Sequence, residues 1–421
     1  MLFYRLFIWL FPKLVWLLSF SNHKARKWTE GRKGIFKKLS IEFHNNQAPV
    51  IWMHTASLGE FEQGLPVLQR LKKDYQGYRI LLTFFSPSGF EVRKNYSGID
   101  YIFYLPIDSP SNATRFLNIV QPSLILFVKY EFWYFYLQEA KNRNIPLLLI
   151  SGIFRKNQPF FSWYGGLYRK MLSFYHCLFL QNQLSVELLQ SIGIKEKLIL
   201  SGDTRFDRVI DTFQGFSQIP SINEFCNNQT TIVAGSTWTE DDEELDHFAN
   251  THHLIKFIIA PHDIDVERLK ECQLLYKNSI LYSEYENLLF TGGLLSKHIN
   301  VLIIDNVGLL SKLYYYATIC YVGGGFGDDG IHNILEPAVF GKPVIFGPVY
   351  DKYFEAGELI DCGGGFSIDD ALELEGLILQ LLENNELSQK AGESAGIYVR
   401  NHAGSTNHII KYIHENRLLI N

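Results

Sequence analysis

Cysteine is scarce in this chain: its 421 residues include five cysteines, and no two of them form a CxxC pair. An odd number of separated cysteines predicts neither a disulfide framework nor a zinc site. We interpret them as small buried hydrophobic residues in a reducing compartment. No set of His or carboxylate residues with ligand spacing accompanies Asp328 and Asp329, which favours a polar loop there over a metal site. We therefore expect no metal ion and no cofactor.

Positive charge is concentrated in the first forty residues and is scarce afterwards. The formal net charge is -5, and residues 1–40 contain nine Lys or Arg against one Glu, a net charge of +8 that leaves -13 for the remainder. Tight binding to nucleic acids depends on many cationic contacts with phosphates. The acidic body therefore excludes general nucleic-acid binding, and the basic end needs its own explanation.

Charged residues are almost absent from residues 2–20, where only Arg5 and Lys13 occur. Their side chains lie about 80° apart around a helix, so both can project from the same side of it. This arrangement is typical of a helix that lies in a membrane interface. The run is also just long enough to span a bilayer. A signal peptide or a buried core helix is a third reading, although no small-residue cleavage site follows. We favour residues 1–40 as an interfacial anchor on the cytoplasmic face of the inner membrane, with the basic cluster 24–38 beside anionic lipid.

From residue 48 onward, short β-branched or aromatic runs alternate with helix-length stretches, which predicts α/β domains with parallel sheets covered on both faces. The expected strands are Val50–His54, Arg79–Phe84, Tyr101–Leu105, Leu124–Val128, Leu147–Ile150, Cys177–Leu180, Lys197–Leu200, Thr231–Ala234, Phe257–Ala260, Ile280–Tyr282, Val301–Ile304, Ile319–Val322 and Val344–Phe346. We expect two doubly wound, Rossmann-like domains, at 41–210 and 229–395, joined by a linker at 211–228 rich in Gly, Ser, Pro and Asn. Residues 396–421 are expected to be helical. Ligands of such sheets bind beyond the carboxyl ends of the strands, so two facing edges would form a cleft.

A glycine-rich stretch follows the expected strand at 319–322 and reads "GGGFGDDGIHNILEP". Glycines such as Gly324 and Gly325 let a ligand approach the backbone, and a helix expected to begin near 331–333 would favour an anion. Asn333 and Glu336 are three residues apart and share one face of that helix. A carboxylate there can accept both hydroxyls of a ribose, although it can also simply complement the helix dipole.

Three further residues of the same domain are candidates for a nucleotide site. Lys352 could meet a phosphate charge, although most surface lysines are only solvated. Ser236 and Thr237 end the first strand of this domain, where such residues bind a phosphate or a base, or cap a helix.

In the N-terminal domain, the stretch "MHTASLGEFEQ" passes from a strand into a helix and carries Glu60 at the junction. We expect solvent and the helix dipole to keep Glu60 ionised, either as a general base for a substrate hydroxyl or as a capping carboxylate. Glu131 follows another strand. Arg155, Arg205 and Arg208 also lie at or after strand ends, where arginine suits phosphates.

The chain resembles the 3-deoxy-D-manno-octulosonic acid (Kdo) transferases, a family of inverting, membrane-associated enzymes with the GT-B fold. The matching motifs occur in family order along almost the whole chain: His54–Glu60, Thr83 with Ser86–Gly89, Leu105–Asp108, Glu131–Trp133, Gly202–Arg208, Gly235–Thr237 and His332–Pro337. Two positions depart from the pattern. The family's Pro-Arg-His is replaced by Pro261-His262-Asp263, which lacks the arginine, though Arg268 follows. The family's Gly-Gly-His-Asn is replaced by Gly330-Ile331-His332-Asn333, which lacks the second glycine.

The resemblance implies that Glu60 is the general base and Glu131 a second acidic residue of the site. The donor, CMP-Kdo, would be bound by Gly324, Gly325, Asn333 and Glu336, with Ser236, Thr237, Arg268 and Lys352 nearby. The acceptor, a lipid A precursor (lipid IVA), would be bound by Ser57, Gly59, Ser88, Arg155, Arg205 and Arg208. No metal is implied. Another GT-B transferase, a sugar-nucleotide epimerase and a non-catalytic membrane scaffold remain as alternatives.

Overall fold

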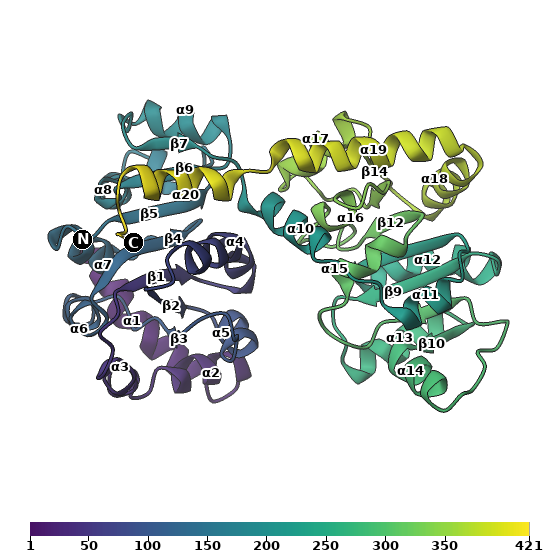
Figure 1. Ribbon diagram of the computed structural model, residues 1–421, viewed down its shortest axis with the longest axis horizontal. Helices are drawn as coiled ribbons and strands as arrows, with labels where there is room; N and C mark the ends of the chain where they lie inside the picture. The colour runs from purple at the N-terminus through teal and green to yellow at the C-terminus, as the bar shows by residue number, and fades with distance from the viewer. Residues whose placement is uncertain (421) are drawn as a thin grey trace. The chain divides into compact units, whose positions relative to one another are not determined.

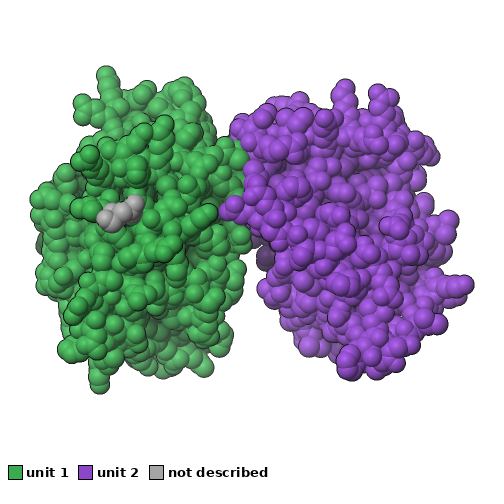
Figure 2. All heavy atoms as spheres, viewed as in Figure 1, with its two compact units in different colours: residues 1–208, 403–421 green, residues 209–402 purple. Residues whose placement is uncertain are grey.

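The computed structural model describes residues 1–420, which divide into two compact units. The first unit contains residues 1–208 and the end of the chain from residue 403, and the second contains residues 209–402 (Figure 2). Figure 1 labels their elements. Each unit is an α/β domain with a parallel sheet of seven strands.

The sheet of the first unit has the order β3-β2-β1-β4-β5-β6-β7. Its strands are β1 (Val50–Thr55), β2 (Arg79–Phe84), β3 (Tyr101–Tyr104), β4 (Pro122–Val128), β5 (Leu147–Gly152), β6 (Cys177–Leu180) and β7 (Leu198–Leu200). Its helices are α1 (Leu2–Leu18), α2 (His23–Gly31), α3 (Ile35–Phe43), α4 (Leu58–Asp74), α5 (Pro87–Arg93), α6 (Pro110–Val120), α7 (Tyr134–Asn142), η1 (Pro159–Phe161), α8 (Gly166–Phe174), α9 (Gln183–Ser191) and α20 (Ser405–Glu415). Helix α10 (Thr204–Gln214) runs from this unit into the second.

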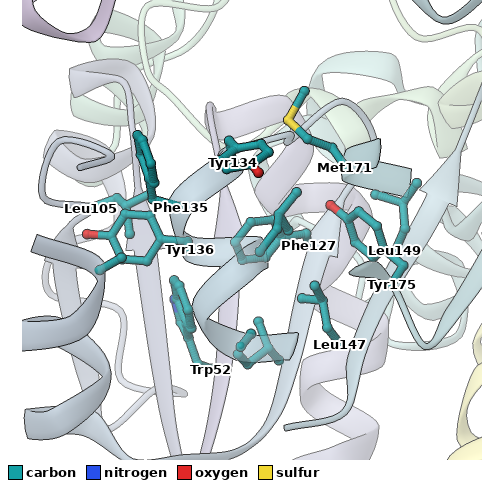
Figure 3. Packing of buried hydrophobic residues seen from close by; sticks show 14 of the residues in the cluster. Trp52, Leu105, Phe127, Tyr134, Phe135, Tyr136, Leu147, Leu149, Met171 and Tyr175 are labelled. Atoms are coloured by element: carbon teal, nitrogen blue, oxygen red, sulfur yellow. The ribbon is translucent and has the colours of Figure 1, made fainter. Parts of the chain in front are cut away.

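Alternate residues of the strands pack on opposite faces of this sheet, as strand geometry requires. On β1, Trp52 belongs to the cluster around Phe127 and Tyr136, whose rings lie 5.3 and 5.7 Å from the Trp52 ring (Figure 3). Ile51 and Met53 face the other cluster, which α4 and α20 cover. Both faces are therefore buried, as the continuous apolar runs predicted.

The C-terminal helix α20 belongs to the first unit, although the residues before it belong to the second. The Asp207 carboxylate holds its beginning, because it accepts hydrogen bonds of 2.6 Å from the backbone N–H groups of Gly404 and Thr406. Ile409 and Ile413 then bury their side chains in the cluster beside α4.

The sheet of the second unit has the order β10-β11-β9-β8-β12-β13-β14. Its strands are β8 (Thr231–Thr237), β9 (Lys256–Pro261), β10 (Ser279–Leu281), β11 (Val301–Ile303), β12 (Ile319–Val322), β13 (Val344–Phe346) and β14 (Gly365–Ser367). Its helices are α11 (Pro220–Cys226), α12 (Thr239–Thr251), α13 (Val266–Leu275), α14 (Tyr282–Phe290), α15 (Leu310–Leu313), η2 (Tyr314–Tyr316), α16 (Leu335–Ala338), α17 (Phe354–Asp361), α18 (Ala371–Glu383) and α19 (Asn385–His402). All thirteen expected strands are present, while β14 and the short helix α11 were not expected.

Each sheet contains one point at which the strand order reverses around its first strand. In the first unit this point lies between β1 and β4, and in the second it lies between β8 and β12. Loops leave the sheet in opposite directions at such a point, which opens a crevice at the carboxyl ends of the two strands. Glu60 follows β1 and Glu131 follows β4, while the glycine-rich stretch follows β12.

The N-terminal helix α1 exposes most of its large apolar side chains, including Phe3, Trp9, Leu10 and Leu17. Among residues 1–420, none of the helices is both long enough and apolar enough to cross a bilayer.

Helix α1 is fixed to the first unit through Tyr4. The Tyr4 hydroxyl donates to Asp108 and accepts a 3.1 Å hydrogen bond from the backbone N–H of Tyr134. Asp108 also accepts 3.0 Å hydrogen bonds from the N–H groups of Phe135 and Tyr136, so it caps α7. One buried carboxylate thus joins α1 to the start of α7.

One residue of the expected basic cluster is bound within the first unit. Arg32 is half-buried, and its guanidinium donates to the carbonyl groups of Leu105, Phe85 and Trp28 at 3.0, 2.8 and 3.2 Å. Burial lowers its pKa to about 9. The guanidinium of Arg32 thus binds backbone carbonyls of the first unit, while the placement of the basic cluster 24–38 beside anionic lipid stays a prediction.

Candidate functional site

The β1–β4 edge of the first unit carries Glu131 in a network of buried polar groups. Its carboxylate lies 2.7 Å from the Nε2 atom of His54 and accepts a 2.5 Å hydrogen bond from the indole N–H of Trp133. The other ring nitrogen of His54, Nδ1, lies 2.9 Å from the Thr83 hydroxyl. Tyr175 donates its hydroxyl to the Glu131 carbonyl at 2.7 Å. Glu131 is therefore held in place by groups from two strands, β1 and β2, and from the ends of two helices, α7 and α8.

Glu60 lies beside this network, in the first turn of α4. One of its carboxylate oxygens accepts a 2.5 Å hydrogen bond from the backbone N–H of Ala56. Burial and the charge of Glu131 raise the pKa of Glu60 from 4.5 to about 8, although the Ala56 N–H and the charge of Lys129 act in the opposite direction. At neutral pH this carboxyl therefore holds its proton. The expectation of an ionised Glu60 was wrong, since it assumed solvent where the structure has burial and a like charge.

A carboxyl with a pKa near the working pH suits proton transfer better than an ordinary one. A base must be deprotonated to act, and a base of higher pKa takes a proton more readily. Side chains whose pKa is shifted by burial and by a specific charge are enriched at sites of acid–base chemistry. Glu60, whose pKa is raised by burial and by the charge of Glu131, has this character.

Three of the expected acceptor residues surround the same edge. Ser57 is the N-cap residue of α4 and Gly59 is its second residue. Outside its own helix turn, no atom among residues 1–420 lies within 4 Å of the position that a Cβ of Gly59 would take. Ser88 lies in the first turn of α5, after β2, and its hydroxyl is 3.0 Å from that of Ser86.

The three arginines expected near the acceptor differ in their surroundings. Arg155 follows β5 and is exposed, and its backbone N–H donates to the Gln158 side chain at 3.1 Å. Arg205 forms a 2.7 Å ion pair with Asp203, and Arg208 forms one of 3.0 Å with Glu62. The last two positive charges are therefore partly neutralised within the protein, which the positions after strand ends did not indicate.

Tyr130 was missed by the sequence analysis, although it precedes Glu131. Its hydroxyl is buried and lacks a hydrogen-bond partner among residues 1–420. Burial and the charge of Glu60 raise its pKa, whereas the charges of Arg155 and Arg205 lower it. Tyr130 thus lies close to the charges of Glu60, Arg155 and Arg205. The preceding residue, Lys129, has a φ of 63°, a left-handed backbone conformation that is rare outside glycine and marks this loop.

In the second unit, Asp241 organises the loop after β12. Its carboxylate accepts hydrogen bonds of 2.8 Å from the backbone N–H groups of Trp238 and Gly324, and one of 2.7 Å from the Tyr321 hydroxyl. The Gly324 N–H was expected to bind a phosphate. It instead donates to Asp241, because the N-terminal turn of α12 lies against this loop.

The glycines of this loop are explained by close backbone packing. Gly324 has a φ of +91°, and a Cβ there would lie 2.6 Å from the Gly330 carbonyl oxygen. A Cβ at Gly325 would lie 2.6 Å from the Gly347 backbone. Both positions exclude side chains because of the loop itself, so the glycines alone are not evidence for a ligand.

Asn333 and Glu336 are in contact, as their spacing predicted: the Asn333 amide donates to the Glu336 carboxylate at 3.1 Å. The helix that carries Glu336 is shorter than expected. Helix α16 begins at Leu335 and has 4 residues, and Gly341 follows it in a left-handed conformation with a φ of 68°. The helix dipole expected to favour a phosphate is correspondingly small.

The remaining residues expected at the nucleotide site are placed as follows. Ser236 and Thr237 end β8, at the point where the strand order reverses. Lys352 donates its ammonium group to the Asp328 carbonyl at 2.6 Å. Arg268 is buried and forms ion pairs with Asp242 and with Glu271, the latter at 2.7 Å. The prediction that Arg268 contacts the donor is not supported by this geometry, because its guanidinium binds two carboxylates of α12 and α13.

Sequence analysis also missed a stack of three rings at the β8–β12 edge. The rings of Trp238 and His262 lie 4.5 Å apart, and those of His262 and His332 lie 4.5 Å apart, both nearly parallel. The Trp238 indole N–H donates to His332 Nε2 at 3.1 Å. Burial and the neighbouring His262 lower the pKa of His332 to about 4. His262, which stands where the resembled family has arginine, is thus part of an aromatic stack.

Residues 1–420 contain no group of three or more His, Cys, Asp or Glu side chains arranged to hold a metal ion.

Comparison with known proteins places this chain in a family. Residues 28–208 match the family model described as 3-deoxy-D-manno-octulosonic-acid transferase (kdotransferase). The chain is 30% identical to 3-deoxy-D-manno-octulosonic acid transferase of Aquifex aeolicus over 380 residues, which cover 87% of this chain and 96% of that protein. It is 27% identical to the enzyme of the same name from Chlamydia trachomatis serovar A, over 94% of this chain and 91% of that protein.

Solved structures establish the fold class. A UDP-GlcNAc 2-epimerase from Neisseria meningitidis superposes with a TM-score of 0.60 at 16% identity, covering 87% of this chain and 100% of that chain. At this identity the likeness concerns the GT-B-type fold alone, so it does not favour the epimerase alternative. The sequence relatives decide the family. The chain is a glycosyltransferase and belongs to the 3-deoxy-D-manno-octulosonic acid (Kdo) transferase family.

Proposed function

We propose that the protein transfers Kdo from CMP-Kdo to a lipid A precursor, lipid IVA, with inversion at the anomeric carbon. One observation carries the mechanism: Glu60, with a pKa of about 8, lies beside Glu131 at the edge where the strand order of the first sheet reverses. Such a carboxylate, once deprotonated, can accept the proton of an acceptor hydroxyl. The family to which the chain belongs supports the choice of sugar.

The proposed reaction is a single displacement. The Glu60 carboxylate removes the proton of the acceptor hydroxyl while the hydroxyl oxygen attacks the anomeric carbon of Kdo. The bond from that carbon to the CMP phosphate breaks on the opposite face, so the configuration inverts and CMP leaves with the electron pair. Glu131 does not touch the acceptor in this scheme: it positions His54 and Trp133 and raises the pKa of the base.

The function is tested by measuring CMP release from CMP-Kdo with and without lipid acceptor. We expect CMP release to depend on the lipid and to match the amount of Kdo attached to it. A scaffold would release no CMP. A transferase or epimerase acting on another nucleotide sugar would leave CMP-Kdo intact in both reactions.

The donor site offers a prediction of its own. Replacing Glu336 with Gln removes the charge that would accept the ribose hydroxyls, and hydrogen bonds to charged groups contribute about 1.5–3 kcal/mol. We therefore expect Glu336→Gln to raise the KM for CMP-Kdo by about 10- to 100-fold in steady-state kinetics, with the KM for lipid unchanged. Glu267→Gln, an exposed first-turn acid of α13, is the control. Equal donor KM values in both variants would contradict the assignment.

We also propose that α1 lies in the interface of the inner membrane, on its cytoplasmic face. Its exposed apolar residues, which include Leu10 and Leu17, support this placement. The variant Leu10→Glu/Leu17→Glu should bind anionic phospholipid vesicles at least about tenfold more weakly in sedimentation, since two apolar contacts become charged. The matched variant Leu184→Glu/Leu372→Glu changes two exposed leucines outside α1 and should bind normally. Undiminished binding of the α1 variant would refute the placement.

A further inference from the structure

A pocket of about 740 Å³ lies in the first unit, directly beside Glu131. Its walls come from three segments: α1, the β4–α7 loop, and the stretch from η1 through α8. The lining residues on which the argument depends are Tyr4, Glu131, Trp133, Tyr164, Leu167 and Met171. The proposed reaction does not use this pocket.

The interior of the pocket is apolar and aromatic. Phe160 packs against Phe132 and Tyr168, with ring centroids 4.9 and 5.5 Å apart, and all three rings line the pocket. Met171 closes one wall from α8; Figure 3 shows it above Tyr134 and Tyr175.

Three of the polar groups on the walls form hydrogen bonds within the protein, whereas the hydroxyl of Tyr130, which also lines the pocket, has no hydrogen-bond partner among residues 1–420. The Tyr4 hydroxyl donates to Asp108, the Trp133 N–H donates to Glu131, and the Gln158 side chain accepts from the Arg155 backbone. The chemistry of the lining thus fits a hydrocarbon, and its one carboxylate is Glu131 at the catalytic end.

The other end of the pocket reaches the exposed apolar surface of the unit. Phe3 of α1 is 85% exposed and lines the pocket. Tyr164, on the segment before α8, is 59% exposed and also lines it, next to Trp163, which is 93% exposed. The pocket therefore joins the surface proposed to contact the membrane with the carboxylate network at the β1–β4 edge.

We infer that this pocket holds one acyl chain of the acceptor lipid; this inference rests on the proposed function and names how its substrate is recognised. Its volume falls within the range of about 300–1,000 Å³ that is usual for ligand pockets. Charge complementarity supports an acceptor over a bulk lipid. Arg155 and Lys156 are exposed on the loop that leads to Gln158 at the pocket wall, where they can meet a sugar phosphate.

The consequence is that the enzyme recognises the acceptor partly by its acyl chain. Burial of a methylene group changes affinity by about fourfold. Shortening the buried acyl chain by two carbons should therefore raise the KM for the acceptor by about 15-fold. The bound acyl chain also positions the sugar hydroxyl near Glu60, since the headgroup attached to it must lie next to the pocket end at Glu131.

The experiment compares an acylated acceptor with a fully deacylated one, in wild type and in Leu167→Trp. The larger side chain at Leu167, a partly buried position on α8, fills the pocket without altering Glu60 or Glu131. We expect Leu167→Trp to raise the KM for the acylated acceptor at least tenfold. The KM for CMP-Kdo and the rate with the deacylated acceptor should stay the same. Leu184→Trp, at an exposed position on α9, is the control.

A second measurement detects occupancy of the pocket and does not depend on Kdo transfer. An acylated acceptor with a photoreactive group at the chain end is bound to the full-length protein, irradiated, and located by peptide mass spectrometry. We expect labelling of the Phe160–Met171 segment, which an excess of acylated acceptor without the photoreactive group prevents and which Leu167→Trp abolishes. Labelling elsewhere, equal labelling in Leu167→Trp, or full protection by ordinary phospholipid vesicles would overturn the inference. Failure of Kdo transfer to every acceptor would instead refute the proposed function, whatever the labelling shows.

Discussion

Replacing Glu60 with Gln should reduce the turnover number by about 10²–10⁴, the usual contribution of a general base. The substitution removes the only proton acceptor that the proposed displacement uses while keeping nearly the same shape. Gln resembles the protonated carboxyl that burial favours at neutral pH, and its side-chain oxygen can still accept from the Ala56 N–H. We therefore expect the variant to fold normally. Turnover is measured as Kdo-lipid formed per enzyme at saturating concentrations of both substrates.

The matching control lies on the same helix. Asp74 forms an exposed ion pair with Arg70 at the other end of α4, so Asp74→Asn should change turnover by less than about twofold, as surface ion pairs contribute little. The dissociation constant for CMP should be the same in wild type and both variants, because the donor site is assigned to the second unit. Turnover of Glu60→Gln within twofold of wild type would refute the role of Glu60 as base.

The pH dependence of the reaction should have an unusually high midpoint for a glutamate. Because burial and the Glu131 charge raise the pKa of Glu60 to about 8, the active, deprotonated form is a minority below that pH. The value of kcat/KM should fall about tenfold for each pH unit below the midpoint and reach a plateau above it. Between pH 8 and pH 6 this amounts to a loss of about fiftyfold. A midpoint near 4.5, the ordinary value for glutamate, would contradict the environment described for Glu60.

The variant Glu131→Gln separates the two causes of the raised pKa. It removes the like charge but leaves a side-chain oxygen that can accept from Trp133. Without that charge, the deprotonated form of Glu60 is less unfavourable, so the midpoint of the kcat/KM profile should move to lower pH. Glu62→Gln, two residues from Glu60 and paired with Arg93 and Arg208, should leave the midpoint in place. A midpoint that stays fixed in Glu131→Gln, or moves to higher pH, would mean that Glu131 does not tune the base.

The strands and the location of the site were predictable because both depend on local sequence patterns. Short apolar runs such as 124–128 favour strands buried on two faces, and their alternation with helices favours parallel sheets. Since ligands bind at the carboxyl ends of such strands, the order of elements alone placed Glu60 and Glu131 at one edge. β14 was missed because its three residues, Gly365–Ser367, carry no apolar run.

The electrostatic state of the site was not predictable, because it depends on contacts between residues distant in sequence. Glu131 raises the pKa of Glu60 from 71 positions away, and His54 reaches Glu131 from 77. Arg268 was expected near the donor because it follows the position at which the resembled family has an arginine. Its partner Asp242 is 26 positions away, on a different helix. Such long-range pairs decide whether a charged side chain is available to a ligand.

The surroundings of His262 were likewise not predictable from the sequence. Sequence comparison with the family pattern indicated a lost arginine, and Arg268 was the obvious replacement. The structure instead stacks His262 between Trp238 and His332. Neither the stack nor the low pKa of His332 could be derived from residue spacing, since the three rings come from the ends of β8, β9 and β12.

Mass analysis of the lipid recovered after incubation with CMP-Kdo tests the account most directly, with wild type and Glu60→Gln run in parallel. We expect wild type to convert the acceptor into a species heavier by one or more Kdo residues, and Glu60→Gln to leave almost all of it unconverted over the same time. An acceptor of unchanged mass with wild type, or equal conversion by both proteins, would contradict the account.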